Sequence, residues 1–170
     1  NQDCMDTSWL QDDPVLSHTV IIGNDWNGHA MKENVLEMND GFLVDARRFL
    51  KSDEGQVRNF YYRFKEQKRT AGVIHYIACN NGFTLRDMIS YDVKHNEANG
   101  ERNQDGTQYN YSWNCGFEGP TRRKSVLTMR RKQEKNALVM LLLGMGAPLL
   151  LAGDEFGRTQ KGNNNAYCLD

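Results

Sequence analysis

The sequence lacks an excess of charge of either sign, since 21 basic side chains balance 22 acidic ones over 170 residues. It also lacks long apolar runs, because the longest, residues 137–145, is interrupted by Gly144 and is too short to span a bilayer. The opening Asn-Gln-Asp-Cys-Met-Asp does not have the basic and then apolar segments of a signal peptide. We therefore expect no nucleic-acid partner, no membrane association and no signal peptide.

Cysteine is sparse, and its spacing excludes the common metal-binding patterns. The four cysteines, Cys4, Cys79, Cys115 and Cys168, form no Cys-x-x-Cys pair. No compact set of oxygen ligands for calcium is present either, so we expect neither a metal nor a cofactor. Scattered cysteines of this kind are typical of reduced thiols in a reducing compartment, which predicts a cytoplasmic location.

Apolar patterning predicts an α/β chain with parallel strands. Three apolar runs are typical of buried strands, and they cover residues 20–23, 72–79 and 148–152. Helical spacing predicts three helices, over residues 42–50, 56–67 and 124–145. Asp40 is the expected N-cap of the first helix, and residues 57, 60, 61 and 64 are the expected apolar face of the second. No repeat or low-complexity linker divides the chain, so its length indicates one domain over residues 1–170.

A series of ordered motifs occupies the second half of the chain. They are Asn81-Gly-Phe-Thr-Leu-Arg-Asp87, Lys94-His-Asn-Glu-Ala-Asn-Gly100, Asp105-Gly-Thr107, Tyr111-Ser-Trp-Asn-Cys-Gly116, Leu151-Ala-Gly-Asp-Glu-Phe-Gly-Arg-Thr-Gln160 and Gly162-Asn-Asn-Asn-Ala-Tyr-Cys168. Together they resemble the C-terminal half of the catalytic barrel of isoamylase-type glycogen-debranching enzymes, in the α-amylase superfamily. The resemblance is strongest from Val73 to Cys168 and weaker from Asp13 to Gly55.

The resemblance implies a partial (β/α)8 TIM-type barrel holding about strands five to eight. The long polar segments 94–119 and 153–170 follow predicted strands, so both would lie on the working face of such a barrel. A half barrel leaves two open strand edges and an uncovered apolar face. We therefore expect completion by self-association as a homodimer or by a partner that supplies a complementing half-barrel.

The positions that carry the chemistry in this family are substituted here. The general acid of the family is a Glu before a Pro-Trp pair, and Asn24 stands in its place. The transition-state-stabilising Asp and its partner His fall on Asn81 and Asn80, and the nucleophile lies on an earlier strand, before this chain begins. Amides do not titrate near neutral pH, and a retaining glycosidase needs two carboxyl groups. Asp25 could replace the acid only with a register shift, because neighbouring strand residues point to opposite faces. The resemblance therefore implies a pseudoenzyme with no catalytic residue in place.

Sugar rings pack on aromatic faces, and amides both donate to and accept from hydroxyls, so the remaining motif residues favour an α-glucan or maltooligosaccharide site. The candidate residues are Trp26, Tyr111, Trp113, Asn114, Asp154, Arg158, Asn164 and Tyr167, with Tyr109 beside them.

Each of these features has a plainer alternative. The aromatic residues would equally anchor their loop, and Asp154 would equally be a hydrogen-bonded loop anchor. Asn80 and Asn81 would be either a change towards uncharged glucan binding or simple loss of the charged residues. Three functions stay open: an inactive debranching-like protein of carbohydrate metabolism, a glucan-binding module, and a structural half-barrel.

Overall fold

One parallel sheet organises the protein, for which a computed structural model describes residues 13–24, 34–67 and 72–166. Its strands are β1 (Ile21–Gly23), β2 (Val35–Met38), β3 (Gly72–His75) and β4 (Ala147–Pro148). They lie in the order β1-β2-β3-β4, and all three pairings are parallel. The predicted α/β class with parallel strands is confirmed, and within the described residues β1 and β4 form the two edges of the sheet.

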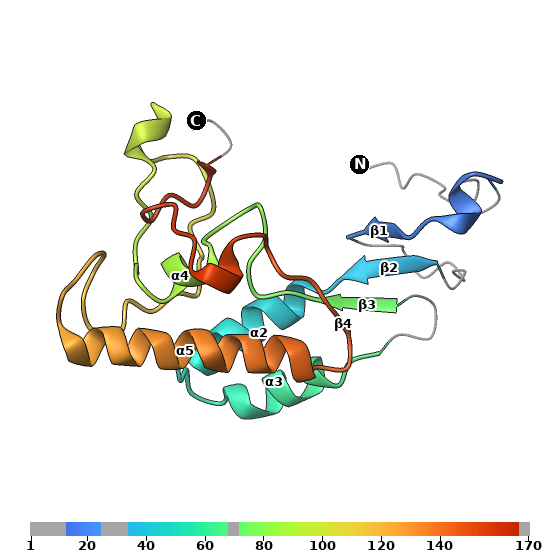
Figure 1. Cartoon of the computed structure of the whole chain (residues 1–170), viewed down its shortest axis with the longest axis horizontal. Helices are drawn as coiled ribbons and strands as arrows, with labels where there is room; N and C mark the ends of the chain where they lie inside the picture. Colours follow the sequence, from blue (N-terminus) through green and yellow to red (C-terminus); the bar gives the residue numbers. More distant parts are fainter. Residues whose placement is uncertain (1–12, 25–33, 68–71, 167–170) are drawn as a thin grey trace.

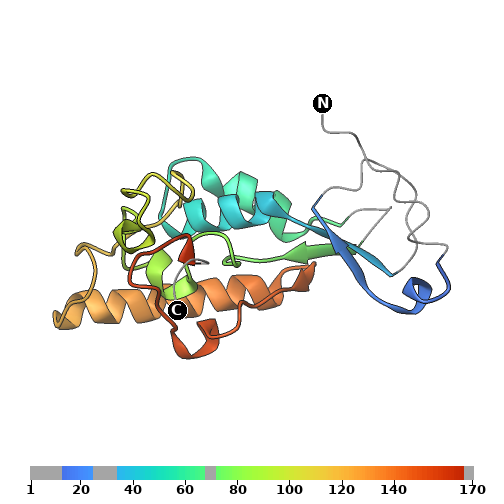
Figure 2. The same cartoon turned by 90° about the horizontal axis from the view of Figure 1, so that it is seen from above.

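Helices follow β2 and β3 along the chain. The α-helices are α2 (Asp40–Leu50), α3 (Gln56–Phe64), α4 (Leu85–Met88) and α5 (Lys124–Leu143), and the 3₁₀ helices are η1 (Leu16–His18), η2 (Glu97–Asn99) and η3 (Asp154–Phe156). Figures 1 and 2 show α5 running alongside α2 and α3, with the sheet extending from this helical layer. The segments between α4 and α5 and after η3 gather at the end of the molecule away from η1.

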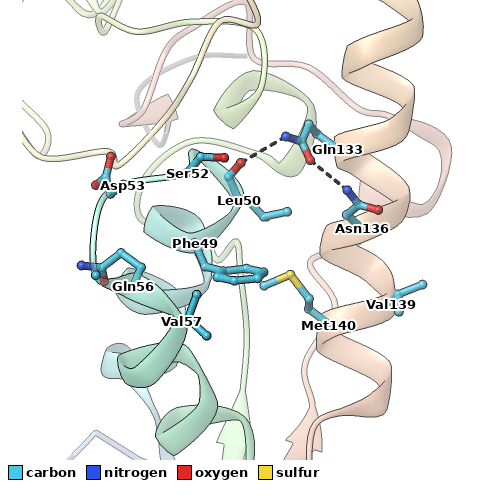
Figure 3. Close-up of a pocket in the computed structure, with 11 residues that line it drawn as sticks. Phe49, Leu50, Ser52, Asp53, Gln56, Val57, Gln133, Asn136, Val139 and Met140 are labelled. Atoms are coloured by element: carbon cyan, nitrogen blue, oxygen red, sulfur yellow. Dashed lines mark hydrogen bonds between the residues drawn. The ribbon is translucent and has the colours of Figure 1, made fainter.

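The core lies where α2 meets α5. Phe42, Ala46 and Leu50 are spaced along one face of α2 and pack in one buried cluster with Ala137 and Met140 of α5. Gln133 of α5 is buried as well, and its Nε2 donates a 3.1 Å hydrogen bond to the Leu50 carbonyl (Figure 3). Burial of several large apolar side chains at about 1.5–3 kcal/mol each is what holds this helix pair together.

Three strands differ from the expectation. β3 ends at His75 instead of residue 79. No strand was expected at Val35–Met38, where β2 forms between β1 and β3. The buried strand expected over residues 148–152 is wrong: β4 covers Ala147–Pro148 alone, and both residues are exposed. Its edge position explains the difference, because β4 pairs with β3 on one side only and Pro148 has no amide hydrogen to extend the ladder.

The helix ends also correct two expectations. Asn39, not Asp40, is the N-cap of α2, because its side-chain Oδ1 accepts a 3.0 Å hydrogen bond from the Phe42 amide. In α3, Phe60 pairs with Phe42, whereas Val57 and Tyr61 are exposed. The helix ends at Phe64, three residues before its expected end, and of the expected apolar face Phe60 and Phe64 pack against the core. Among the described helices, none is long and apolar enough to cross a membrane.

Candidate functional site

The asparagines predicted to replace the catalytic residues of the family lie beyond the carboxyl ends of two strands. Asn24 directly follows β1, and the turn with Asn80 and Asn81 lies beyond the end of β3. All three asparagines are exposed. Because the strands are parallel, their carboxyl ends lie at one end of the sheet. Asn24, Asn80 and Asn81 all follow strands in the chain, as predicted.

A buried arginine joins the Asn80–Asn81 turn to the aromatic segment. Arg47 of α2 donates through Nε to the Ile77 carbonyl at 2.7 Å, and through Nη1 to the Asn110 carbonyl at 2.8 Å. Its Nη2 reaches the Phe83 carbonyl at 3.3 Å. Burial lowers the pKa of Arg47 to about 10, while nearby Cys79, Asp154 and Tyr76 act in the opposite direction. The guanidinium stays charged at neutral pH and fixes both ends of the turn.

A second connection is made by buried amides. Asn164 is fully buried, and its Nδ2 donates to the Asn110 Oδ1 and the Thr107 carbonyl, both at 2.8 Å. Its Oδ1 accepts from Asn96 Nδ2 at 2.8 Å, and its carbonyl accepts from the Gly82 amide at 3.0 Å. The segments around residues 82, 96, 110 and 164, far apart in sequence, therefore form one loop platform. Asn164 was expected among the binding residues, and here its side chain is used inside the protein.

The aromatic residues of the platform differ in exposure. Tyr109 is 77% exposed, whereas Tyr111 and Trp113 are half-buried. Trp113 packs against the core cluster, and its amide donates to the Met88 carbonyl at 2.9 Å. The side chain of Asn114 is bonded to Glu118 Oε2 and to the Gly116 amide. Tyr109 is thus the aromatic side chain most available to a ligand, and glucan binding by this segment stays a prediction.

Asp154 is placed as an anchor between loops. Its Oδ1 accepts a 3.1 Å hydrogen bond from the Leu85 amide, at the first residue of α4. Burial raises the pKa of Asp154, while that hydrogen bond and the charges of Arg158 and Arg47 lower it. Arg158 lies close to Gly153, where an added Cβ would come within 2.7 Å of the Arg158 Cδ. Asp154 therefore ties η3 to the start of α4, and the Arg158 backbone amide donates to the Gly153 carbonyl at 2.9 Å. A direct role of either side chain in binding stays a prediction.

Some residues of the site were not expected. The Tyr76 hydroxyl donates to Asp40 Oδ1 across the ends of β3 and β2, and burial raises the pKa of Tyr76, so the hydroxyl stays protonated. Arg47 and Asn110 were also missed as organising residues. In the sequence, the organising role of Arg47 is indicated only by its charged side chain next to the apolar positions Phe42, Ala46 and Leu50. Sequence spacing does not predict which backbone carbonyls it binds.

Two of the expected binding residues, Trp26 and Tyr167, lie outside the described residues. In the described part of the chain, no group of three or more His, Cys, Asp or Glu side chains could hold a metal ion. A hollow of about 570 Å³ opens in the helical layer between the α2–α3 connection and α5 (Figure 3). It contains Phe49, Val57 and Met140 and lies among the helices, apart from the strand ends.

The strand-end asparagines offer hydrogen bonds but no proton transfer. An amide both donates and accepts without titrating near neutral pH, so it can bind a hydroxyl and cannot act as general acid or nucleophile. The Cys79 thiol donates to the Asn81 carbonyl, and the exposed Asp40 carboxylate accepts from the Tyr76 hydroxyl. This arrangement suits recognition of uncharged polar groups.

Comparison with known proteins identifies the relatives of this chain. No family model matches it. The glycogen operon protein GlgX homolog of Mycobacterium tuberculosis is 38% identical over 95% of this chain and 24% of that protein. Isoamylase 3, chloroplastic, of Oryza sativa subsp. japonica is 40% identical over 93% of this chain and 22% of its own length. The glycogen debranching enzyme of Klebsiella pneumoniae strain 342 is 40% identical over 95% of this chain and 27% of its own length.

The aligned region sets the scope of this likeness. The chain spans about a quarter of the length of these relatives. The aligned residues nevertheless cover 95% of the chain in the Mycobacterium tuberculosis and Klebsiella pneumoniae proteins. Over nearly its whole length, the chain is homologous to a segment of the isoamylase-type glycogen-debranching enzymes.

Proposed function

We propose that this chain is a catalytically inactive, debranching-like segment that binds α-glucan through the loop platform at its strand ends. The observation that carries the proposal is the set of exposed amides Asn24, Asn80 and Asn81 at positions where the family places titratable groups. Relatives named as glycogen debranching enzymes and isoamylase supply the substrate class. Tyr109 is exposed and precedes Asn110, whose carbonyl accepts a hydrogen bond from Arg47. The Tyr109 ring offers a surface for a sugar ring.

The finer features of the fold belong to the same proposal. Four sequential parallel strands are what strands five to eight of a (β/α)8 barrel would provide, within a single partial-barrel domain. The barrel would be completed by a second copy or by a complementing half-barrel, and the location would be cytoplasmic. A purely structural half-barrel is the alternative, favoured by Asn164 and Asp154, whose side chains are used within the protein.

Catalytic inactivity is tested with branched substrates. We expect the chain to release reducing ends from pullulan or glycogen at the background rate, because loss of single essential groups costs orders of magnitude in rate. Hydrolysis that copurifies reproducibly with the chain would refute the inactive assignment, provided that it does not come from a contaminating host enzyme.

Binding is tested by calorimetric titration with a branched maltooligosaccharide. Tyr109→Ala should weaken the affinity by roughly fivefold, the size of one aromatic stacking contact. Because Tyr109 is 77% exposed, its truncation leaves the fold intact, whereas Trp113→Ala also removes packing against the core. Tyr62→Ala, an exposed aromatic truncation on α3, is the matched control and should bind normally. An absence of saturable binding by the unmodified chain would favour the structural half-barrel.

A further inference from the structure

A small cavity beside α4 is built from cations and unpartnered donors. It measures about 210 Å³ and lies between α4, the segment around Gly119 and the middle of α5. Its lining includes Arg86, Ser90, Tyr91, Thr121 and Arg130. This volume is several times the roughly 30 Å³ share of one liquid water and below the roughly 300 Å³ at which drug-sized sites begin. Its size therefore selects a ligand of a few heavy atoms.

Arg130 brings a buried positive charge to this cavity. It is 2% exposed, and its Nη1 donates to the Gly119 carbonyl at 2.8 Å. Its Nη2 is directed at the carbonyls of Ser90, Asn114 and Phe117. Among the described residues Arg130 forms no ion pair, and its buried Nε has no hydrogen-bond partner. Burying a cation without a counterion is costly, so this guanidinium favours an anion nearby.

Two neighbours add to the donor set. Ser90 is 4% exposed, and its Oγ is buried without a hydrogen-bond partner in the described part of the chain. Arg86 reaches the same cavity from α4 and uses Nη1 for a 2.9 Å ion pair with Glu134. The proximity of Arg86 contributes to lowering the pKa of Arg130, after the larger effect of burial. Two like charges are held close together around one small space.

The nearby carboxylates do not cancel both cations. Glu134 is paired with Arg86. Glu118 accepts from the backbone amides of Asp92 and Val93, and Asp87 accepts from Thr159 Oγ1 and the Gln160 amide. Burial raises the pKa of Asp87, while its hydrogen bonds with Thr159 and Gln160 lower it. The Arg130 guanidinium therefore has no carboxylate in contact among the described residues, and it is free to interact with an oxoanion.

We propose that this cavity binds a small tetrahedral oxoanion, phosphate or a phosphate monoester, between Arg86 and Arg130 with Ser90 as a further donor. Guanidinium groups match the oxygen pairs of phosphate, and buried charge-assisted hydrogen bonds are the stronger kind. The site is separate from the exposed amides at Asn80 and Asn81. The inference does not depend on glucan binding or on the lack of catalysis.

The test is calorimetric titration of the chain with inorganic phosphate at constant ionic strength, set by sodium chloride. We expect saturable binding that is weakened roughly tenfold by Arg86→Gln, which removes one charged donor at the rim, and roughly threefold by Ser90→Ala. Arg130→Gln is avoided as the main variant because Arg130 also holds four carbonyl groups of the fold. Lys132→Gln, which removes a charge from an exposed position on the same helix, should leave the affinity unchanged.

Two outcomes would overturn the proposal. One is the absence of phosphate binding beyond that of chloride at equal ionic strength. The other is phosphate binding that Arg86→Gln and Ser90→Ala leave as strong as in the unmodified chain. A second arm with methyl phosphate identifies the source: equal or tighter binding supports the phosphoryl group of a larger molecule, and binding of inorganic phosphate alone supports the free ion.

Discussion

At the scale of single residues, His75 is the most unusual side chain of the core. It is fully buried and stacks on Phe42, with ring centroids 4.0 Å apart and planes tilted by 5°. An added Cβ at Gly144 or Gly146 would come within 2.7 Å of its ring, so glycine is needed on both sides of residue 145. Neither ring nitrogen has a hydrogen-bond partner within the described residues. Such a site holds a neutral imidazole.

His75 should make the stability of the protein depend on pH. Burial lowers the pKa of His75, with the charge of Glu66 opposing, so the unfolded chain takes up its proton first as the pH falls. The free energy of unfolding is then highest above the unfolded pKa of about 6.5 and decreases as the pH falls below it. We expect His75→Phe, which keeps the stacking and removes the titration, to flatten the decline that begins as the pH falls through about 6.5.

Denaturant unfolding at several pH values measures this effect. The pKa values of Asp87 and Asp154 are raised by burial, so these two carboxyl groups act in the opposite direction, and comparison with the variant removes their contribution. His18→Gln, which changes an exposed histidine, is the control. An unchanged pH slope in His75→Phe would show that another group is responsible.

Individual residues were predictable from the sequence to different degrees. The positions of Asn24, Asn80 and Asn81 at strand ends followed from motif order, because motifs are local. The N-cap was placed one residue late, since Asn39 and Asp40 are both good caps and only the bond to the Phe42 amide distinguishes them. Arg47 could not be found, because its three carbonyl partners lie 30, 63 and 36 residues away in sequence.

At the scale of elements, the long periodic helices and the apolar strand β1 were predicted well, whereas β2 was missed and β4 was placed wrongly. The helix expected over residues 124–145 is α5, Lys124–Leu143, and that over residues 42–50 lies within α2. β2 and β4 have four and two residues, too few for a pattern of period two to stand out. Their existence depends on pairing with β3, which is a tertiary effect. The loop platform was recognised as polar, and its interior of paired amides was not.

The loop platform depends on the buried side chain of Asn164, which connects its segments. Asn164→Ala leaves Asn110 Oδ1 and the Thr107 carbonyl without their buried donor and Asn96 Nδ2 without one of its acceptors. We expect the free energy of unfolding to fall by about 2–4 kcal/mol, since each buried group left unpaired costs about 1–3 kcal/mol. Hydrogen exchange should rise at the Gly82 amide, which donates to the Asn164 carbonyl.

Asn59→Ala is the matched control for this change. Asn59 is exposed on α3, and its Nδ2 donates a long, 3.5 Å hydrogen bond to Gln56 Oε1. Its removal should change the free energy of unfolding by less than about 0.5 kcal/mol. If Asn164→Ala were equally mild, the amide network would be replaceable by water, and the platform would not depend on it.

At the scale of the whole molecule, both edges of the sheet expose apolar side chains. Val20 and Ile22 are exposed at β1, and both residues of β4 are exposed. The end of α5 that leads into β4 adds three more exposed apolar side chains, Leu142, Leu143 and Met145. Open edges present unpaired amide and carbonyl groups to any other strand, and exposed apolar patches mark association surfaces.

These edges predict that the 170-residue chain associates in solution. Sedimentation velocity should show a species larger than the monomer of 19.6 kDa, with the fraction of that species rising with concentration. Ile22→Lys and Leu143→Lys place charges at the β1 edge and at the end of α5, so each should shift the distribution towards the monomer. Val57→Lys, an exposed apolar-to-charged change on α3, should not shift it. A strictly monomeric chain that also fails to bind a hydrophobic dye would contradict association, because its edges would then have to be covered within the chain itself.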